Sequence, residues 1–251
     1  MRESSGPVQF AAQMLLQPVS LSGGRLDPSL LRLYESEIAF IKELKRLEIN
    51  NIQMISASAW WDPSFAAESG DRSVLAILYA TENAHLYLQH LEVIYPEGGI
   101  DEETDNATAQ CRIVAELLKR HMMPSVAVEI NGIGRFLPGL LRRELQRINS
   151  SCRVLEVSSR RGKDLRILEA FDALLAGWRL HVHRRVMNTP FATEMHDWRP
   201  RKSGGHDDCL DAVAGAISLR PARLGSLPSL PPTQSWTGAT QTAHADTDFA
   251  V

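Results

Sequence analysis

The order of apolar segments in the middle of the chain limits the possible folds more than any other feature of the sequence. Residues 52–60 and 74–80 are predominantly apolar, and residues 86–94 alternate apolar with polar side chains, as strands do. The short polar turn between the last two runs predicts an antiparallel hairpin. Strand and helix patterns then alternate, with strands at 126–130, 154–157 and 180–182 and helices at 104–122, 134–148, 163–176 and 207–219. This order predicts an α/β fold whose mixed central sheet, antiparallel hairpin first and parallel strands afterwards, is flanked by helices.

The two ends of the chain differ from this compact unit, which we place at residues 50–220. Residues 1–49 are expected to form a linker-like N-terminal arm with a helix over 27–48, where leucine and isoleucine recur at helical spacing. Residues 221–251 are rich in proline, serine, threonine, glycine and alanine and contain few large apolar side chains. Such a segment cannot bury enough surface to offset its chain entropy, so we expect a disordered C-terminal tail.

The composition excludes several classes of protein. The chain has 251 residues, 44% of them hydrophobic and 23% charged, as in ordinary globular proteins. It contains no uncharged apolar run of about 18 residues and no apolar segment at its N-terminus, so we expect neither a membrane partner nor a secretory signal. Three cysteines without a C-x-x-C pair argue against a disulfide framework and a structural zinc site. The net charge of −3 would, by itself, argue against a nucleic-acid binder.

Acidic residues interrupt or end several of the apolar segments. Asp62 follows the run 52–60, and Glu129 lies inside the apolar sequence Val-Ala-Val-Glu-Ile. Asp207, Asp208 and Asp211 lie at the start of the last predicted helix, where Asp208 and Asp211 share one face. Carboxylates are rarely buried unless they are paired or bind a metal ion. Glu129 is therefore the most informative single residue in the chain.

Each acidic position also has a structural explanation that requires no function. Asp207 is a candidate cap for the last helix, whose N-terminus favours negative charge. Asp62-Pro63 fits a turn, and Glu129 could pair with a buried arginine. Together, however, these ends of strands and of a helix can converge at one edge of the sheet. Such a cluster repels itself unless cations neutralise it, and hard oxygen ligands suit Mg²⁺ or Mn²⁺. Two such ions can promote phosphodiester hydrolysis.

Four motifs occur in an order that resembles a known family. They are Trp61-Asp62-Pro63 with Gly70-Asp71-Arg72-Ser73-Val74, then Val128-Glu129-Ile130-Asn131-Gly132-Ile133-Gly134, then Gly162-Lys163-Asp164-Leu165-Arg166, and finally His206-Asp207-Asp208-Cys209-Leu210-Asp211-Ala212. This set resembles the C-terminal nuclease domain of the large terminase subunit of tailed bacteriophages, over roughly residues 50–219. The resemblance implies a ribonuclease H-like fold related to Holliday-junction resolvases.

The resemblance also implies an activity and a set of ligands. It implies a DNA endonuclease that cuts concatemeric viral genomes during packaging, with two Mg²⁺ or Mn²⁺ ions as cofactors and double-stranded DNA as substrate. By position, Asp62, Glu129 and Asp208 would be metal ligands, with Asp211 as the fourth acidic site. Our hypothesis is that Asp62 bridges both ions and that Glu129 and Asp208 hold one each. Which of Asp207, Asp208 and Asp211 binds metal directly stays open, and Asp71 is a secondary candidate.

One feature departs from the family. A complete large terminase subunit carries an ATPase motor with a G-x-x-x-x-G-K-[ST] loop, and the only Gly-Lys pair here, Gly162-Lys163, lacks that context. We therefore expect no ATP hydrolysis by this chain. The resemblance then implies a separate ATPase motor, a small terminase subunit and a portal as partners. It places the protein in the cytoplasm of an infected or lysogenic bacterial host.

Basic residues concentrate near the second half of the predicted site. Residues 142–166 contain eight basic and three acidic side chains, although charge runs are often only solvated helix faces. Arg160, Arg161, Lys163 and Arg166 are the candidate DNA contacts, because they surround a predicted loop and phosphate contacts give sequence-independent binding. If four carboxylates belong to a metal site, 27 basic residues face 26 other acidic ones, and the objection from net charge weakens. We expect Trp60, Trp61, Trp178 and Trp198 to serve packing.

Two alternatives to a packaging nuclease remain. One is a junction resolvase or transposase-type nuclease of the same fold, which would prefer four-way junctions to linear duplex. The other is a non-catalytic packaging module that docks the motor or the portal. The acidic residues present at every motif position argue against the second alternative.

Overall fold

The computed structural model describes residues 26–64, 72–95, 105–130, 135–158, 162–200, 206–219 and 221–224. Most of the predicted arm and tail, residues 1–25 and 225–251, therefore lies outside the described residues. The same holds for Asp71, Arg160 and Arg161 and for the Asn131-Gly132 pair.

The main sheet has the mixed architecture that the sequence predicts. Its strands are β1 (Arg32–Tyr34), β5 (Ser56–Asp62), β6 (Ser73–Ala80), β7 (Leu86–Ile94), β8 (Ser125–Glu129), β9 (Arg153–Val157), β10 (Leu180–His183) and the short β11 (Ala222–Arg223). In the described part of the chain their order is β1-β10-β7-β6-β5-β8-β9, with β11 beside β5. Strands β5, β6 and β7 are antiparallel, whereas β5-β8-β9 and β7-β10-β1 pair in parallel. The predicted hairpin is β6–β7.

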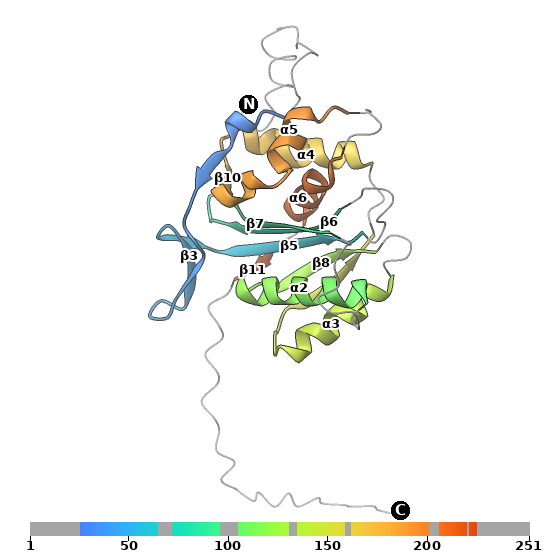
Figure 1. Cartoon of the computed structure of the whole chain (residues 1–251). Helices are drawn as coiled ribbons and strands as arrows, with labels where there is room; N and C mark the ends of the chain where they lie inside the picture. The colour runs from blue at the N-terminus through green and yellow to red at the C-terminus, as the bar shows by residue number, and fades with distance from the viewer. Residues whose placement is uncertain are drawn as a thin grey trace, which may run out of the picture.

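Helices cover both faces of this sheet (Figure 1). Helices α2 (Asn106–Arg120) and α3 (Leu137–Arg147) lie on one face, and α4 (Lys163–Ala176), α5 (Phe191–Asp197) and α6 (Asp208–Ser218) lie on the other. Successive strand residues point to opposite faces, so Trp60 belongs to the core under α4–α6 and Trp61 to the core under α2 and α3. Every residue of β6 is buried, because this central strand contributes to both cores.

Helix α6 packs unusually close to the sheet. A Cβ atom built on Gly215 would lie 2.4 Å from the Cδ2 atom of Trp60, so only glycine allows this approach. Trp60 is 3% exposed and also lies under the guanidinium of Arg166, 5.5 Å from the ring centroid. The indole therefore sets the height of α6 above the strand ends.

The helix predicted over 27–48 is wrong. The segment instead forms the 3₁₀ turn η1 (Pro28–Leu30), strand β1, and strands β2 (Ala39–Ile41) and β3 (Arg46–Ile49), the last two joined by β4 (Ile52–Met54) in a small antiparallel sheet. Lys45 has a φ of 49°, which is incompatible with a continuous α-helix. Only some of the apolar side chains that suggested helical spacing lie in strands, such as Leu33 of β1, which forms the edge of the main sheet beside β10.

Other sequence expectations need smaller corrections. Residues 222–223, in the predicted disordered tail, form β11 and pair with β5. Trp178, expected to be a packing residue, is 44% exposed, whereas Trp60, Trp61 and Trp198 are buried. Helix α5 and the 3₁₀ turn η3 (Arg184–Asn188) before it had no counterpart in the prediction. Among the described helices, none combines the length and apolar character needed to cross a membrane.

Candidate metal centre

Two neighbouring strands and one helix bring three carboxylates together. Asp62 is the last residue of β5, and Glu129 is the last residue of β8. These strands are parallel and paired, Trp61 opposite Val128, so both acidic residues lie at the same edge of the sheet. Asp211 approaches from the first turn of α6. One carboxylate oxygen from each of these three residues lies within 4.8 Å of the other two.

The carboxylate cluster is largely shielded from solvent, and it concentrates negative charge. Glu129 and Asp211 are 6% and 5% exposed. The pKa of Asp62 is raised to about 7, first by burial and then by the charges of Glu129 and Asp211, against the opposing charge of Lys163. Carboxylates that repel one another in this way favour a protonated state or a bound cation. The site is therefore suited to hard, positively charged ligands.

Two basic side chains from the start of α4 already contact the cluster. Arg166 donates from Nε and Nη2 to Asp211 Oδ1, at 2.9 and 2.5 Å, and its Nη2 lies 3.6 Å from Glu129 Oε2. Lys163 Nζ lies 2.6 Å from Asp207 Oδ1 and 3.6 Å from Asp211 Oδ2. Burial lowers the pKa of Lys163, but its hydrogen bond to Asp207 and the charge of Asp211 outweigh that effect and raise it. Both side chains are therefore cationic at neutral pH.

The acidic residues of α6 occupy three different environments. Asp211 joins Asp62 and Glu129, Asp207 pairs with Lys163, and Asp208 accepts a hydrogen bond of 3.2 Å from the backbone amide of Arg72. The three-carboxylate group thus contains Asp211, and Asp208 lies at its margin, close enough for its charge to raise the pKa of Asp62. Asp207 makes no side-chain capping bond, so the capping explanation does not account for it.

The candidate DNA contacts are only partly placed. Arg160 and Arg161 lie outside the described residues. The side chain of Lys163 is 40% exposed, whereas that of Arg166 is 9% exposed and lies among the carboxylates. Arg166 is also the buried arginine with which, as the sequence suggested, Glu129 could pair. Contact with DNA stays a prediction for all four residues.

Sequence reasoning missed two residues behind the cluster, Arg72 and Glu194. Arg72 was quoted only as part of a motif, and Glu194 lies in α5, which the sequence did not predict. The pKa of Glu194 is raised to about 7, because burial outweighs the opposing effect of hydrogen bonds from the backbone of residues 209 and 210. No residue pattern marked this contact, because Glu194 and α6 meet only in the folded chain.

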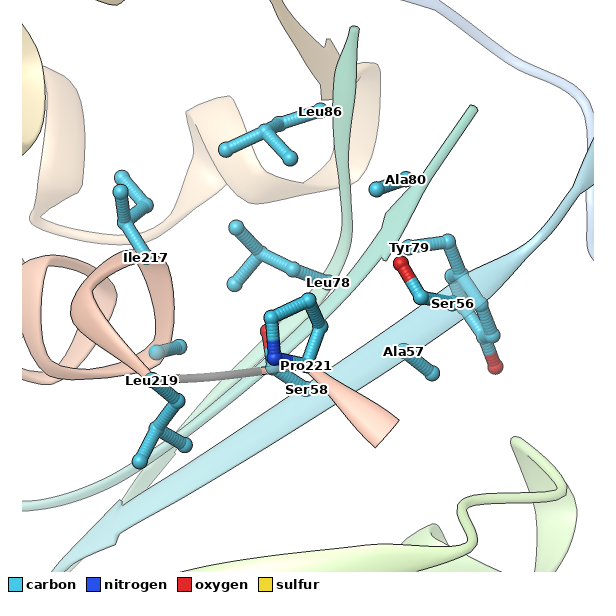
Figure 2. Close-up of a pocket in the computed structure, with 11 residues that line it drawn as sticks. Ser56, Ala57, Ser58, Leu78, Tyr79, Ala80, Leu86, Ile217, Leu219 and Pro221 are labelled. Carbon is cyan, nitrogen blue, oxygen red and sulfur yellow. The ribbon is translucent and has the colours of Figure 1, made fainter. Parts of the chain in front are cut away.

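A small hollow at the other end of α6 does not compete with this site (Figure 2). Its volume is about 30 Å³, and its lining includes Leu78, Ile217, Leu219 and Pro221. That space accommodates about one water molecule, far less than a nucleotide needs. Compared with this hollow, the carboxylate cluster is the stronger candidate for chemistry.

A comparison with protein families confirms the resemblance that the motifs indicate. A family model described as the terminase RNaseH-like domain matches residues 59–220. No curated protein matches the sequence.

Similar folds occur among solved structures. The Mn-soaked, inhibitor-bound human cytomegalovirus terminase nuclease domain is 16% identical, with a TM-score of 0.49 over 65% of this chain and 82% of that one. The nuclease domain of the large terminase subunit of bacterial virus Sf6 is 11% identical, with a TM-score of 0.44 over 65% and 88%. RuvC of T. thermophilus in complex with a Holliday junction substrate is 15% identical, with a TM-score of 0.37 over 64% and 90%. Similarity at this level concerns the fold alone.

Proposed function

Because the chain belongs to the family of terminase RNase H-like domains, we propose that it is a metal-dependent DNA endonuclease that cuts concatemeric viral DNA during genome packaging. One observation carries the proposal: Asp62, Glu129 and Asp211 place carboxylate oxygens within 4.8 Å of one another. A structural role alone rarely gathers carboxylates so closely, because their mutual repulsion opposes folding.

The donor set fits a hard divalent cation. It consists of carboxylate oxygens, with neither thiolates nor imidazoles among the three grouped residues, which suits Mg²⁺ or Mn²⁺. Asp62, Glu129 and Asp211 would hold the cofactor, with Asp208 at the margin as a further ligand. We propose two ions, which when bound would activate a water molecule and stabilise the leaving oxygen in phosphodiester hydrolysis.

The basic residues have separate tasks in this proposal. Arg166 is buried and bonded to Asp211, so it orients that carboxylate and offsets its charge. Lys163 is more exposed and forms an ion pair with Asp207. Its ammonium group can exchange this partner for a DNA phosphate while staying at the surface. Arg160 and Arg161 precede Lys163 in the chain, and we propose them as further phosphate contacts.

The family also suggests the setting of the reaction. We propose double-stranded DNA as the substrate and an ATPase motor, a small terminase subunit and a portal as partners. The site of action would be the cytoplasm of an infected or lysogenic bacterial host. A bacteriophage or prophage genome would then encode the chain. We propose an arm over 1–49, a nuclease domain over 50–220 and a tail over 221–251, with β1 of the arm and β11 of the tail added to the sheet of the nuclease domain.

Nicking of supercoiled plasmid in Mn²⁺ tests the proposal. Asp62→Ala and Glu129→Ala should each abolish nicking, while Glu156→Ala, an exposed carboxylate of β9 that pairs with Arg142, should retain it. Circular dichroism should show that all three variants are folded. Full nicking by both site variants would refute the assignment.

Substrate preference separates the alternatives. Comparable cleavage of linear duplex and four-way junctions supports a packaging nuclease, whereas strong preference for junctions would indicate a resolvase. DNA binding without cleavage in either Mg²⁺ or Mn²⁺ would favour a non-catalytic docking module instead.

A further inference from the structure

The N-terminus of α6 is buried and lacks a cap of its own. The first amides of a helix have no partner within the helix, and burial without another acceptor is costly. Asp207, at the capping position, makes no side-chain capping bond. Cys209 and Leu210, the second and third residues of the helix, are both 0% exposed. Their amides therefore depend on an acceptor from elsewhere in the chain.

Glu194 of α5 supplies that acceptor. Its Oε2 accepts hydrogen bonds from the amides of Cys209, at 2.9 Å, and Leu210, at 3.1 Å. These are the amides that a capping side chain normally satisfies, yet Glu194 lies 15 residues before Cys209. Glu194 is itself 5% exposed, so this contact is largely shielded from water.

The opposite oxygen of Glu194 extends the contact to the sheet. Its Oε1 lies 3.3 Å from Nη1 of Arg72, just before β6. The backbone amide of Arg72 in turn donates to Oδ2 of Asp208, at 3.2 Å. Glu194, Arg72 and the first turn of α6 thus form a closed set of contacts between α5, the start of β6 and α6.

This set of contacts holds the part of α6 that carries Asp208 and Asp211. The other two clustered carboxylates, on Asp62 and Glu129, lie on strand ends, so the spacing of the cluster depends on where the first turn of α6 lies relative to the sheet. A displacement of α6 along its axis would change that spacing directly. Metal sites need their ligands held to within about half an ångström, and outer contacts supply that restraint.

We propose that Glu194 is a positioning residue for the carboxylate cluster: it holds α6 so that Asp211 meets the strand-end carboxylates in a metal-binding arrangement. The inference rests on the proposed function, because it assumes that the cluster binds a divalent cation. Glu194 touches neither the metal nor DNA in this scheme, and it acts only through the helix.

Mn²⁺ affinity of the full chain, measured by calorimetry without DNA, tests the proposal. Glu194→Ala and Glu194→Asp should each weaken Mn²⁺ binding by about 10- to 100-fold, because alanine lacks the acceptor and aspartate is one methylene too short. Glu194→Gln keeps the reach and one acceptor oxygen for the helix amides, but it places an NH₂ donor where Oε1 faces Arg72, so it should lose less Mn²⁺ affinity than either of the other variants.

Glu144→Ala is the matched control. Glu144 is also a buried glutamate, 7% exposed, and pairs with Arg112 and Arg147, but it lies on α3 at the other face of the sheet. Its removal should lower stability without weakening Mn²⁺ binding. Equal losses of affinity in Glu144→Ala and Glu194→Ala would overturn the proposal, as would parent-like affinity in both Glu194→Ala and Glu194→Asp.

Hydrogen exchange separates this inference from the proposed function. In metal-free protein, the amides of Cys209 and Leu210 should exchange at least about tenfold faster in Glu194→Asp than in the parent, because they lose their acceptor. Unchanged exchange would refute the positioning role. A parent protein that binds no Mn²⁺, but whose variants show the faster exchange, would instead refute the proposed function while leaving Glu194 as the residue that holds α6.

Discussion

Replacing Asp62 by asparagine should change the pH dependence of stability in metal-free protein. The pKa of Asp62 rises from its ordinary 3.8 to about 7, first through burial and then through the charges of Glu129 and Asp211. For a carboxyl whose pKa is raised by folding, the stabilisation is complete below its unfolded pKa and is lost as pH rises through the folded one. The difference corresponds to at most about 4 kcal/mol over the whole range. Residual contact with solvent lowers this figure.

Urea unfolding in EDTA at pH 5, 6, 7 and 8 measures the effect. Between pH 5 and 8 the parent should lose up to about 2.5 kcal/mol of unfolding free energy through this carboxyl, because most of its titration falls in that interval. Asparagine has a similar shape and cannot ionise, so the Asp62→Asn curve should be flatter by that amount. The variant should be increasingly more stable than the parent toward pH 8.

Asp105→Asn provides the control. Asp105 caps α2 through hydrogen bonds from Thr108, which lower its pKa. A lowered pKa gives stability that is present above 3.8 and is lost only as the pH falls through the lowered value, so this variant should parallel the parent between pH 5 and 8. Parallel curves for Asp62→Asn and the parent would refute the reasoning, because they would mean that the cluster does not strain Asp62.

Two further predictions concern packing and thiol reactivity. Gly215→Ala should destabilise the protein by about 1–3 kcal/mol in urea unfolding, because the new methyl would lie 2.4 Å from Trp60, whereas Gly139→Ala in α3, with no atom within 4 Å, should stabilise it by up to about 1 kcal/mol. Loss of stability of equal size in both glycine variants would contradict this. Cys111 and Cys152 are buried, which raises their pKa to about 12, so Ellman's reagent at pH 8 should label them only after addition of urea. Rapid labelling of either thiol in the folded protein would show that the cores open readily.

The sheet was largely predictable because its signals are local. Alternation along 86–94 and the short turn before it identify the β6–β7 hairpin, and the later strands alternate with amphipathic helices. The helix prediction for residues 27–48 was wrong for a physical reason. Its apolar spacing fits a helix, but the free edge of β10 provides hydrogen-bond partners that an isolated segment does not have, and β1 takes them.

The candidate site, like the sheet, was predictable from local sequence only in part. Asp62 and Glu129 were recognisable from the sequence, because each ends an apolar strand and such ends meet at one edge of a sheet. The choice among the acidic residues of α6 was not, since it depends on the rotation of the helix about its axis. That rotation is set by the packing of Gly215 on Trp60 and by the contacts of Glu194 with the first amides of the helix.

The sequence by itself determined the order of strands and helices from β5 to β10 and the placement of acidic residues at their ends, because both follow from periodicity within a few neighbouring residues. Only the tertiary structure decided that Asp211 is the residue that joins Asp62 and Glu129, that Arg166 lies among the carboxylates, and that Glu194 holds the helix. Each of these contacts joins segments that are distant in the chain. Their distances depend on how whole elements pack, which no local pattern encodes.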